Sequence, residues 1–394
     1  MEVGLVGKPN VGKTTFFSAA TLATAQIADY PFTTIEPNRG IAYVRIRCPH
    51  VDLGKRCNPV HGACEDGTRL VPVEMLDVAG LVPRAHEGRG LGNKFLDDLR
   101  QASALIHIVD ASGRTDFEGN FVKDGTHDPT EDIQFLEEEL AYWIAGILAR
   151  DWEKNARRAS LQGTPMEETV QERLAGLGLT VTQVLAALKE AGAPPFAARP
   201  AELLPLADAL RRHGKPMMLA ANKADLASPE TLERLRTVKG YETIPTAAEY
   251  ELALRRAAKG SLIDYVPGSA TFAVRDPAKL TAAQQKALET VRSFLDRFGS
   301  TGVQKCVESV VFTLLDRIVV FPVEDETHWT DKKGNVLPDA FLVPRGSTAK
   351  DLAFRVHTDL GTHFIRAIDA RTKMVVGHDH ALKEGDVVKI VAKV

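Results

Sequence analysis

The sequence Gly7-Lys8-Pro9-Asn10-Val11-Gly12-Lys13-Thr14 constrains the fold more than any other feature of the chain. It matches G-x-x-x-x-G-K-[ST] and directly follows the apolar run from Val3 to Val6, so it predicts a strand, a phosphate-binding loop and a helix in that order. Glycines let backbone N–H groups turn inward around an anion, and the positive end of the helix points at the same phosphates. We expect Lys13 to bridge the terminal phosphates. The phosphate-binding residues predicted here are Gly7, Asn10, Val11, Gly12, Lys13, Thr14 and Thr15.

A second motif, N-K-A-D at residues 222–225, follows another apolar stretch and indicates a base-binding loop after a buried strand. The carboxylate of Asp225 can accept hydrogen bonds from the N1–H and the 2-amino group of guanine, whereas adenine presents an acceptor at N1. Such charge-assisted bonds contribute roughly 1.5–3 kcal/mol each, so we expect GTP to bind in preference to ATP. Asn222 is expected to contact the base edge and to tie loops together, and Lys223 to lie along the base plane. A backbone N–H of Ala247 or Ala248 is expected to contact the guanine O6.

Between these motifs, D-V-A-G at residues 77–80 ends a predicted strand. Asp77 in this position can hold Mg²⁺ through water, and the Gly80 N–H can contact a γ-phosphate. The Thr14 hydroxyl and a threonine of the upstream loop, for which we choose Thr34 over Thr33, are the other expected Mg²⁺ ligands. The two loops therefore have the positions of switch I and switch II.

Taken in order, G-K-P-N-V-G-K-T, Y-P-F-T-T-I-E-P-N, D-V-A-G-L, G-x-G-L-G-N-K-F-L and N-K-A-D resemble the Obg family, and more closely its YchF-type branch in an archaeal-like form. Residues 341–359 and 385–390 are similar to a TGS domain, a small β-grasp module. The resemblance implies an α/β fold, a P-loop NTPase with a Ras-like G domain, and association with the ribosome or RNA. YchF-type proteins often lack the N-K-x-D aspartate and favour ATP, but this chain keeps Asp225, which favours GTP.

The region from 116 to 213 is too long for a loop and has helical periodicity, which predicts a helical insert. Asp128-Pro129 is typical of a helix start, and Gly192 of a helix end. The predicted domains are therefore a G domain at 1–115 and 214–305, the insert at 116–213, and a TGS domain at 306–394. One apolar face of the insert is predicted to contain Ile133, Leu136, Leu140, Ile144 and Ile147.

The catalytic machinery is less evident, because Leu81 occupies the position where Ras-like enzymes place a water-orienting glutamine. Slow hydrolysis is therefore expected. Two candidate catalytic residues remain: Asn10, which could help to coordinate K⁺ beside the phosphates, and His86 of the switch II loop, which could orient water. Simple loop stabilisation by Asn10 and solvation of His86 are the alternatives.

Three of the four cysteines cluster as Cys48-x₈-Cys57-x₃-His61-x₂-Cys64, a set of side chains able to bind zinc, with His50 close by. The wide first spacing and the lack of C-x-x-C favour reduced thiols in a surface loop instead. Cys306 stands alone and is expected to be buried.

Net charge is −3, so the chain as a whole has no electrostatic attraction for nucleic acid. Any RNA or ribosome contact must be local, and Arg345, Lys350 and Arg355 of the TGS-like region are candidates for phosphate contacts, with an ordinary solvated helix face as the favoured alternative. No apolar run approaches the ~20 residues of a membrane span, and the first core strand follows Met1 almost at once, so the expected location is the cytoplasm. The alternatives to a GTPase switch are a YchF-type ATPase and an RNA- or ribosome-binding factor in which hydrolysis is minor.

Overall fold

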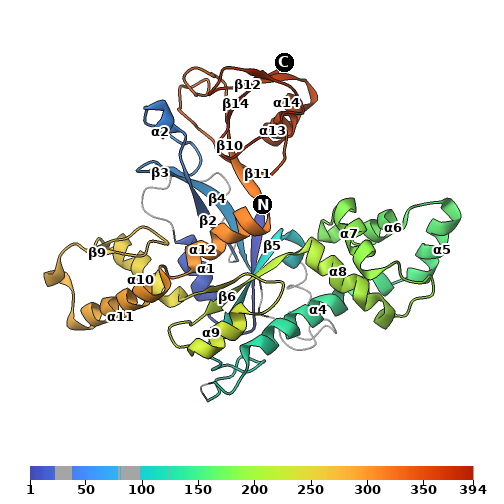
Figure 1. Ribbon diagram of the computed structural model, residues 1–394, viewed down its shortest axis with the longest axis horizontal. Helices are drawn as coiled ribbons and strands as arrows, with labels where there is room; N and C mark the ends of the chain where they lie inside the picture. The colour runs from blue at the N-terminus through green and yellow to red at the C-terminus, as the bar shows by residue number, and fades with distance from the viewer. Residues whose placement is uncertain (23–37, 79, 81–97, 124, 394) are drawn as a thin grey trace. The chain divides into compact units, whose positions relative to one another are not determined.

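The structure is a computed structural model, and it describes residues 1–22, 38–78, 80, 98–123 and 125–393 (Figure 1). Two compact units are present. The first contains the described residues of Met1–Leu22, Pro37–Gly40 and Glu74–Cys306, and the second those of Ile41–Val73 and Val307–Val394. Residues 41–73, which the sequence assigns to the G domain, thus cluster with the C-terminal region. The hydrogen bonds that Asn58, Val60 and Arg69 make to residues 335–338 give the physical reason.

The sheet that begins in the first unit is built around β1, which is parallel to β4 on one side and to β5 on the other. Its strand order is β2-β4-β1-β5-β6-β7, and the short strand β3 is antiparallel to β4. Strand β5 is buried at every residue because it lies inside a parallel sheet that is covered on both faces. The strands are β1 (Glu2–Val6), β2 (Arg39–Arg47), β3 (Ala63–Glu65), β4 (Thr68–Asp77), β5 (Ala104–Asp110), β6 (Met217–Asn222) and β7 (Thr243–Pro245).

The helices of the first unit fall into three groups along the chain. Those next to the sheet are α1 (Lys13–Thr21), α9 (Pro229–Arg236), α10 (Ala248–Lys259) and α12 (Val303–Ser309), the last of which continues into the second unit. Those of the insert are α4 (Pro129–Ala149), α5 (Trp152–Gln162), α6 (Met166–Arg173), η2 (Ala175–Leu177), α7 (Val181–Ala191), η3 (Pro200–Leu203) and α8 (Leu204–Gly214). A further group, which packs on α10, contains β8 (Ile263–Asp264), β9 (Ala273–Val274), η4 (Pro277–Lys279) and α11 (Ala282–Phe298).

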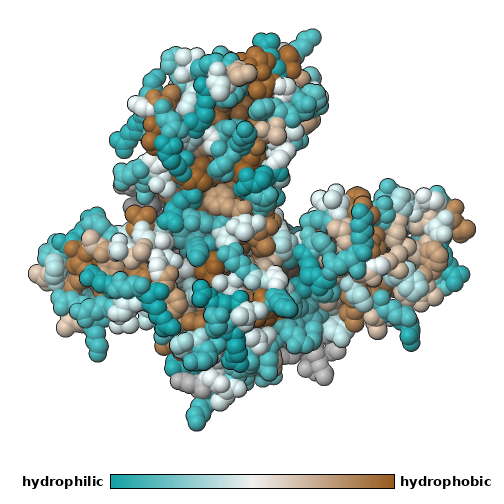
Figure 2. All heavy atoms as spheres, in the orientation of Figure 1, coloured by the Kyte–Doolittle hydropathy of each residue, from teal (hydrophilic) through white to brown (hydrophobic). Residues whose placement is uncertain are grey.

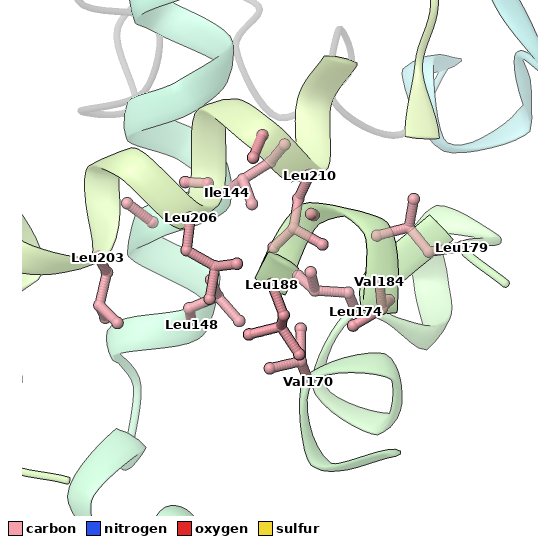
Figure 3. Close-up of a cluster of buried hydrophobic side chains, with 14 of the residues drawn as sticks. Ile144, Leu148, Val170, Leu174, Leu179, Val184, Leu188, Leu203, Leu206 and Leu210 are labelled. Atoms are coloured by element: carbon pink, nitrogen blue, oxygen red, sulfur yellow. The ribbon is translucent and has the colours of Figure 1, made fainter. Parts of the chain in front are cut away.

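The helical insert has its own apolar core. Asp128 caps α4 by accepting a hydrogen bond from Thr130 N at 3.0 Å, and Gly192 follows α7 with φ 80°, as the sequence predicts for both helix ends. Figure 3 shows Ile144 and Leu148 of α4 directed toward Leu206 and Leu210 of α8. The first residues of α4 pack elsewhere: Ile133 and Leu136 lie in clusters with residues of the sheet, so a single helix joins the insert core to the G-domain core.

The second unit contains a mixed sheet in the order β11-β10-β14-β12-β13, which covers the short helices α13 and α14. Its core includes Ile318, Val320 and Leu352, as expected for a β-grasp module. In the part of the chain that the structure describes, no helix is long and apolar enough to cross a membrane. The face drawn in Figure 2 mixes hydrophilic and hydrophobic side chains. The elements are η5 (Val310–Leu314), β10 (Arg317–Val323), β11 (Phe341–Pro344), α13 (Ala349–Val356), α14 (Thr358–Thr362), β12 (Phe364–Asp369), β13 (Val375–Val376) and β14 (Val387–Ala392), together with α2 (His50–Leu53) earlier in the chain.

A buried histidine in the central sheet gives a testable pH dependence. Burial, aided by the charge of Lys8, lowers the pKa of His107 to about 3. The folded chain keeps this side chain neutral where the unfolded chain, with a pKa near 6.5, binds a proton. Stability should therefore fall as pH decreases below about 6.5, by on the order of 3 kcal/mol at about pH 4.5 from this residue.

His107→Leu should remove this contribution and flatten the decline between about pH 6.5 and 4.5, as measured by urea denaturation at several pH values. His378→Leu, at an exposed position, is the matched control and should leave the pH dependence as it is in the parent. Equal slopes for His107→Leu and the parent chain would contradict the assignment.

Candidate nucleotide-binding site

The loop between β1 and α1 has the backbone geometry of a phosphate cradle. Gly7, Asn10 and Gly12 have φ of 156°, 62° and 92°, and Gly12 is the residue from which α1 starts. A Cβ on Gly12 would lie 2.4 Å from Asn222 Nδ2, and one on Gly7 would lie 2.6 Å from Ile108 O. Glycine is therefore required at both positions by close approach as well as by backbone conformation. Val11 is buried, and Thr15 is in the first turn of α1.

Lys13 and Thr14 meet the carboxylate of Asp77. The Lys13 ammonium forms an ion pair with Asp77 Oδ1, and Thr14 Oγ1 donates to Oδ2 at 3.3 Å. The parallel pairing of β1 with β4, in which Leu5 is opposite Asp77, brings these residues together. Gly80 lies on the same side, because a Cβ there would be 3.7 Å from Gly7 O. The predicted phosphate and Mg²⁺ residues of both motifs thus form one cluster.

The N-K-A-D segment is attached to the phosphate loop by two side chains. Asn222 donates from Nδ2 to Val11 O at 2.8 Å, and its Oδ1 accepts from Ala248 N at 3.1 Å. The Lys223 ammonium donates to Asn10 O at 2.8 Å and to Asp110 Oδ2 at 2.9 Å. The structure therefore places Asn222 and Lys223 as ties between loops, which is part of the role that the sequence predicts for Asn222.

Two charged residues that support the phosphate loop were not predicted from the sequence. Asp110 ends β5, opposite Asn222 of β6, and it accepts from Ser112, Thr115 and Lys223. Burial raises the pKa of Asp110, but the hydrogen bonds from Ser112 and Lys223 outweigh burial and hold it below its usual value. The position of Asp110 at the end of a buried strand was the available signal.

Lys8 is the second residue that sequence reasoning missed. Inside the loop motif, its buried ammonium donates to Thr115 O at 2.7 Å and pairs with Asp132 of α4 at 2.8 Å. An internal lysine cannot be inferred from the motif, because its acceptor is more than 100 residues away in the sequence. This ion pair connects the phosphate loop to the first helix of the insert.

The base-recognition residues have partners within the protein. Asp225 is exposed, and burial together with the charge and a hydrogen bond of Asp225 raises the pKa of Tyr250. The N–H of Ala247 donates to Thr301 O at 2.9 Å, and that of Ala248 to Asn222 Oδ1. A contact of either amide to guanine would therefore require a change of partner, so the predicted O6 contact stays a prediction.

The predicted catalytic residues are only partly described by the structure. Asn10 donates from Nδ2 to Gly119 O at 3.0 Å, which fixes the orientation of its side chain. Thr34, Leu81 and His86 lie outside the described residues. His107, in contrast, is a buried core residue of β5.

The cysteine cluster is present, but with a different histidine from the one predicted. Ligand atoms of Cys48, His50, Cys57 and Cys64 all lie within 4.8 Å of one another. His61 is turned away, with its Nδ1 2.5 Å from Asp339 Oδ1, because residues 58–61 pair by their backbone with residues 336–338. Cys48 and Cys57 are buried, which differs from the expectation of thiols in a surface loop. Cys306 is buried, as predicted.

Comparisons with known proteins agree with this geometry. Residues 2–144 match the family model described as 50S ribosome-binding GTPase, residues 220–325 match the Obg-like GTPase YGR210-like, G4 motif-containing domain, and residues 328–392 match the TGS domain. An uncharacterized GTP-binding protein of Methanocaldococcus jannaschii is 51% identical over 392 residues, which span 99% of this chain and 98% of that protein.

Two further relatives extend the comparison. The crystal structure of a GTP binding protein from Pyrococcus horikoshii OT3 aligns over 100% of both chains with 45% identity and a TM-score of 0.80. The ribosome-binding ATPase YchF of Haemophilus ducreyi is 41% identical over 145 residues, or 36% of each chain.

The phosphate loop, the N-K-x-D segment and the C-terminal β-grasp module define a P-loop nucleotide hydrolase with a Ras-like G domain and a TGS domain. Within that class, the chain belongs to the Obg-like GTPase family, as the sequence resemblance predicted, and the identity to the Haemophilus YchF is its likeness to the YchF-type branch.

Proposed function

We propose that this protein binds GTP with Mg²⁺, hydrolyses it slowly, and uses the bound nucleotide as a switch in the cytoplasm. The observation that carries the proposal is the double attachment of the N-K-A-D segment to the phosphate loop, by Asn222 to Val11 O and by Lys223 to Asn10 O. This attachment would hold Asp225 at a fixed position relative to phosphates bound in the loop. A carboxylate in that position favours the N1–H and 2-amino donors of guanine.

The donor set fits Mg²⁺, which prefers hard oxygen ligands. The Thr14 hydroxyl and the Asp77 carboxylate are within hydrogen-bond distance of each other, beside the Lys13 ammonium. Thr14 and Asp77 would hold the ion, with Thr34 as a third proposed ligand, and the ion would neutralise charge on the phosphates. Lys13 would then contact the terminal phosphates.

An exchange of Asp225 for asparagine tests base recognition directly. The amide of Asp225→Asn can donate to the 2-oxo group of xanthine but repels the 2-amino group of guanine, so the variant should lose GTP affinity by about 100-fold or more and gain affinity for xanthosine triphosphate. Isothermal titration with GTP, ATP and xanthosine triphosphate measures all three. Asp296→Asn, an exposed substitution on α11, is the matched control and should bind like the parent.

The same titration distinguishes the second candidate function, that of an ATPase, from that of a GTPase. The name of the Haemophilus relative, a ribosome-binding ATPase, supports ATP as the alternative nucleotide. The ATPase would replace the GTPase as the proposed function if the parent chain bound ATP tightly and Asp225→Asn left the affinities for GTP and ATP unchanged.

For hydrolysis, the proposed residues are Asn10 and His86. The Asn10 amide nitrogen is held by Gly119 O, which leaves the amide oxygen as the atom for K⁺ coordination beside the phosphates. A cation there would supply positive charge where charge develops in the transition state. His86 of the switch II loop would orient the attacking water in place of the glutamine that Leu81 replaces.

Potassium dependence tests the role of Asn10. Single-turnover GTP hydrolysis by the parent should be at least about 10-fold faster in K⁺ than in Na⁺, a barrier difference of about 1.4 kcal/mol, and Asn10→Ala should remove the difference. GTP affinity measured in parallel distinguishes a catalytic effect from loss of binding. Equal rates in K⁺ and Na⁺ for the parent would rule out the proposed cation site.

We also propose that the ribosome is the partner and that the TGS domain makes part of the contact. The family description of residues 2–144 and the name of the Haemophilus relative support this partner. Of the three predicted phosphate contacts, Arg345 is paired with Asp316, whereas Lys350 and Arg355 are exposed on α13. These two cations are therefore the better candidates for contacts to ribosomal RNA.

Charge reversal on α13 tests this surface. The double variant Lys350→Glu, Arg355→Glu should co-sediment with ribosomal subunits several-fold less than the parent at low salt, because like charge repels the RNA backbone. Lys286→Glu, an exposed substitution on α11, is the control for charge alone. Identical sedimentation of the double variant and the parent would exclude α13 from the contact.

A further inference from the structure

The four residues Cys48, His50, Cys57 and Cys64 lie within the second unit, outside the nucleotide site. Cys48 follows β2, His50 begins α2, Cys57 is in the loop after α2, and Cys64 is the middle residue of β3. Cys48 N donates to Gly67 O at 2.7 Å, and Cys64 is paired with Arg69 of β4. The donors therefore come from the end of β2, from β3, which pairs with β4, and from the segment between them.

Two distances between the donor atoms match the edges of a tetrahedral metal centre. With Zn–S of about 2.3 Å and Zn–N of about 2.0–2.1 Å, a tetrahedron has edges of about 3.8 Å between two sulfurs and about 3.6 Å between sulfur and nitrogen. In the structure, Cys48 Sγ and Cys57 Sγ are 3.8 Å apart, and Cys64 Sγ is 3.5 Å from His50 Nδ1. All four ligand atoms are within 4.8 Å of one another.

The charge around the cluster also suits a metal with three thiolates. Arg69 is fully buried, and its guanidinium donates to the carbonyl oxygens of Leu337 at 2.9 Å and Pro338 at 3.1 Å. Zn²⁺ with three thiolates and a neutral imidazole has a charge of −1, which would compensate the buried charge of Arg69. Burial of a guanidinium is costly without compensating charge, and the groups that act on the charge of Arg69 are Cys48, Cys57 and Cys64 together with the carboxylate of Asp339.

We propose that Cys48, His50, Cys57 and Cys64 form a structural Zn²⁺ site. A closed set of three thiolates and one imidazole is a standard ligand set for structural zinc, and four protein ligands leave no position for a substrate. The metal would fix the segment 48–64, where helix is confined to the four residues of α2. That segment in turn donates from Asn58 N to Val336 O and from Val60 N to Pro338 O, so the site would hold it against residues 336–338.

Metal content of the full-length chain tests the proposal. The protein, produced in zinc-supplemented medium without a histidine tag, should contain one zinc ion per chain by plasma mass spectrometry. Cys57→Ser should lose most of this zinc, and His50→Asn should bind it more weakly. Cys306→Ser and His61→Asn are the matched controls and should retain it, because Cys306 lies in the other unit and His61 is paired with Asp339.

Cobalt substitution keeps the test decisive if a variant does not fold. The parent chain, stripped by a chelator under reducing conditions, should take up one Co²⁺ and show the thiolate charge-transfer and intense visible bands of a tetrahedral site, which one equivalent of Zn²⁺ abolishes. Its thermal unfolding midpoint should rise on binding either metal. The proposal would be overturned if the parent failed to bind Zn²⁺ or Co²⁺ stoichiometrically, or if Cys48 and Cys57 formed a disulfide instead of binding metal. Equal zinc loss from His61→Asn and Cys57→Ser would overturn it as well.

Discussion

The hydrogen bonds of the Asn222 amide are the interaction on which the nucleotide site depends. One amide bridges the phosphate loop, through Val11 O, and the start of α10, through Ala248 N. Both partners and the amide are buried, so loss of the side chain would leave polar groups unsatisfied at a cost of about 1–3 kcal/mol. The absence of a Cβ at Gly12 is what allows the amide to approach so closely. The phosphate loop and the N-K-A-D segment are thus joined through one side chain.

Charged groups extend this arrangement into the core. Lys223 joins the N-K-A-D segment to Asp110 at the end of β5, and Lys8 joins the phosphate loop to Asp132 of α4. Each of these ion pairs has a buried carboxylate, so it is weakly screened by solvent, and breaking it would leave a charge without compensation. Through α4, whose later turns pack in the apolar core of the insert, the phosphate loop is linked to the helical insert.

Much of the fold was predictable, because its signals are local. The strand before the phosphate loop, the cap at Asp128 and the end of α7 at Gly192 depend on residues within a few positions of one another. The clustering of residues 41–73 with the C-terminal region was not predictable, because it depends on contacts such as that of Arg69 with Leu337 O, more than 200 residues away. The same holds for Lys8, whose partners Thr115 and Asp132 are more than 100 residues away, whereas Asp110 had a local signal in its position at the end of β5.

The sequence by itself determined the phosphate loop, the N-K-A-D segment and the family, because each rests on residue types at short, fixed spacings whose backbone chemistry is local. Only the tertiary structure decided which histidine joins the cysteines. His50 and His61 are both near them in sequence, but the backbone pairing of residues 58–61 with 336–338 directs His61 to Asp339, whereas α2 places His50 Nδ1 beside Cys64. Side-chain direction depends on such long-range pairing, which residue spacing does not encode.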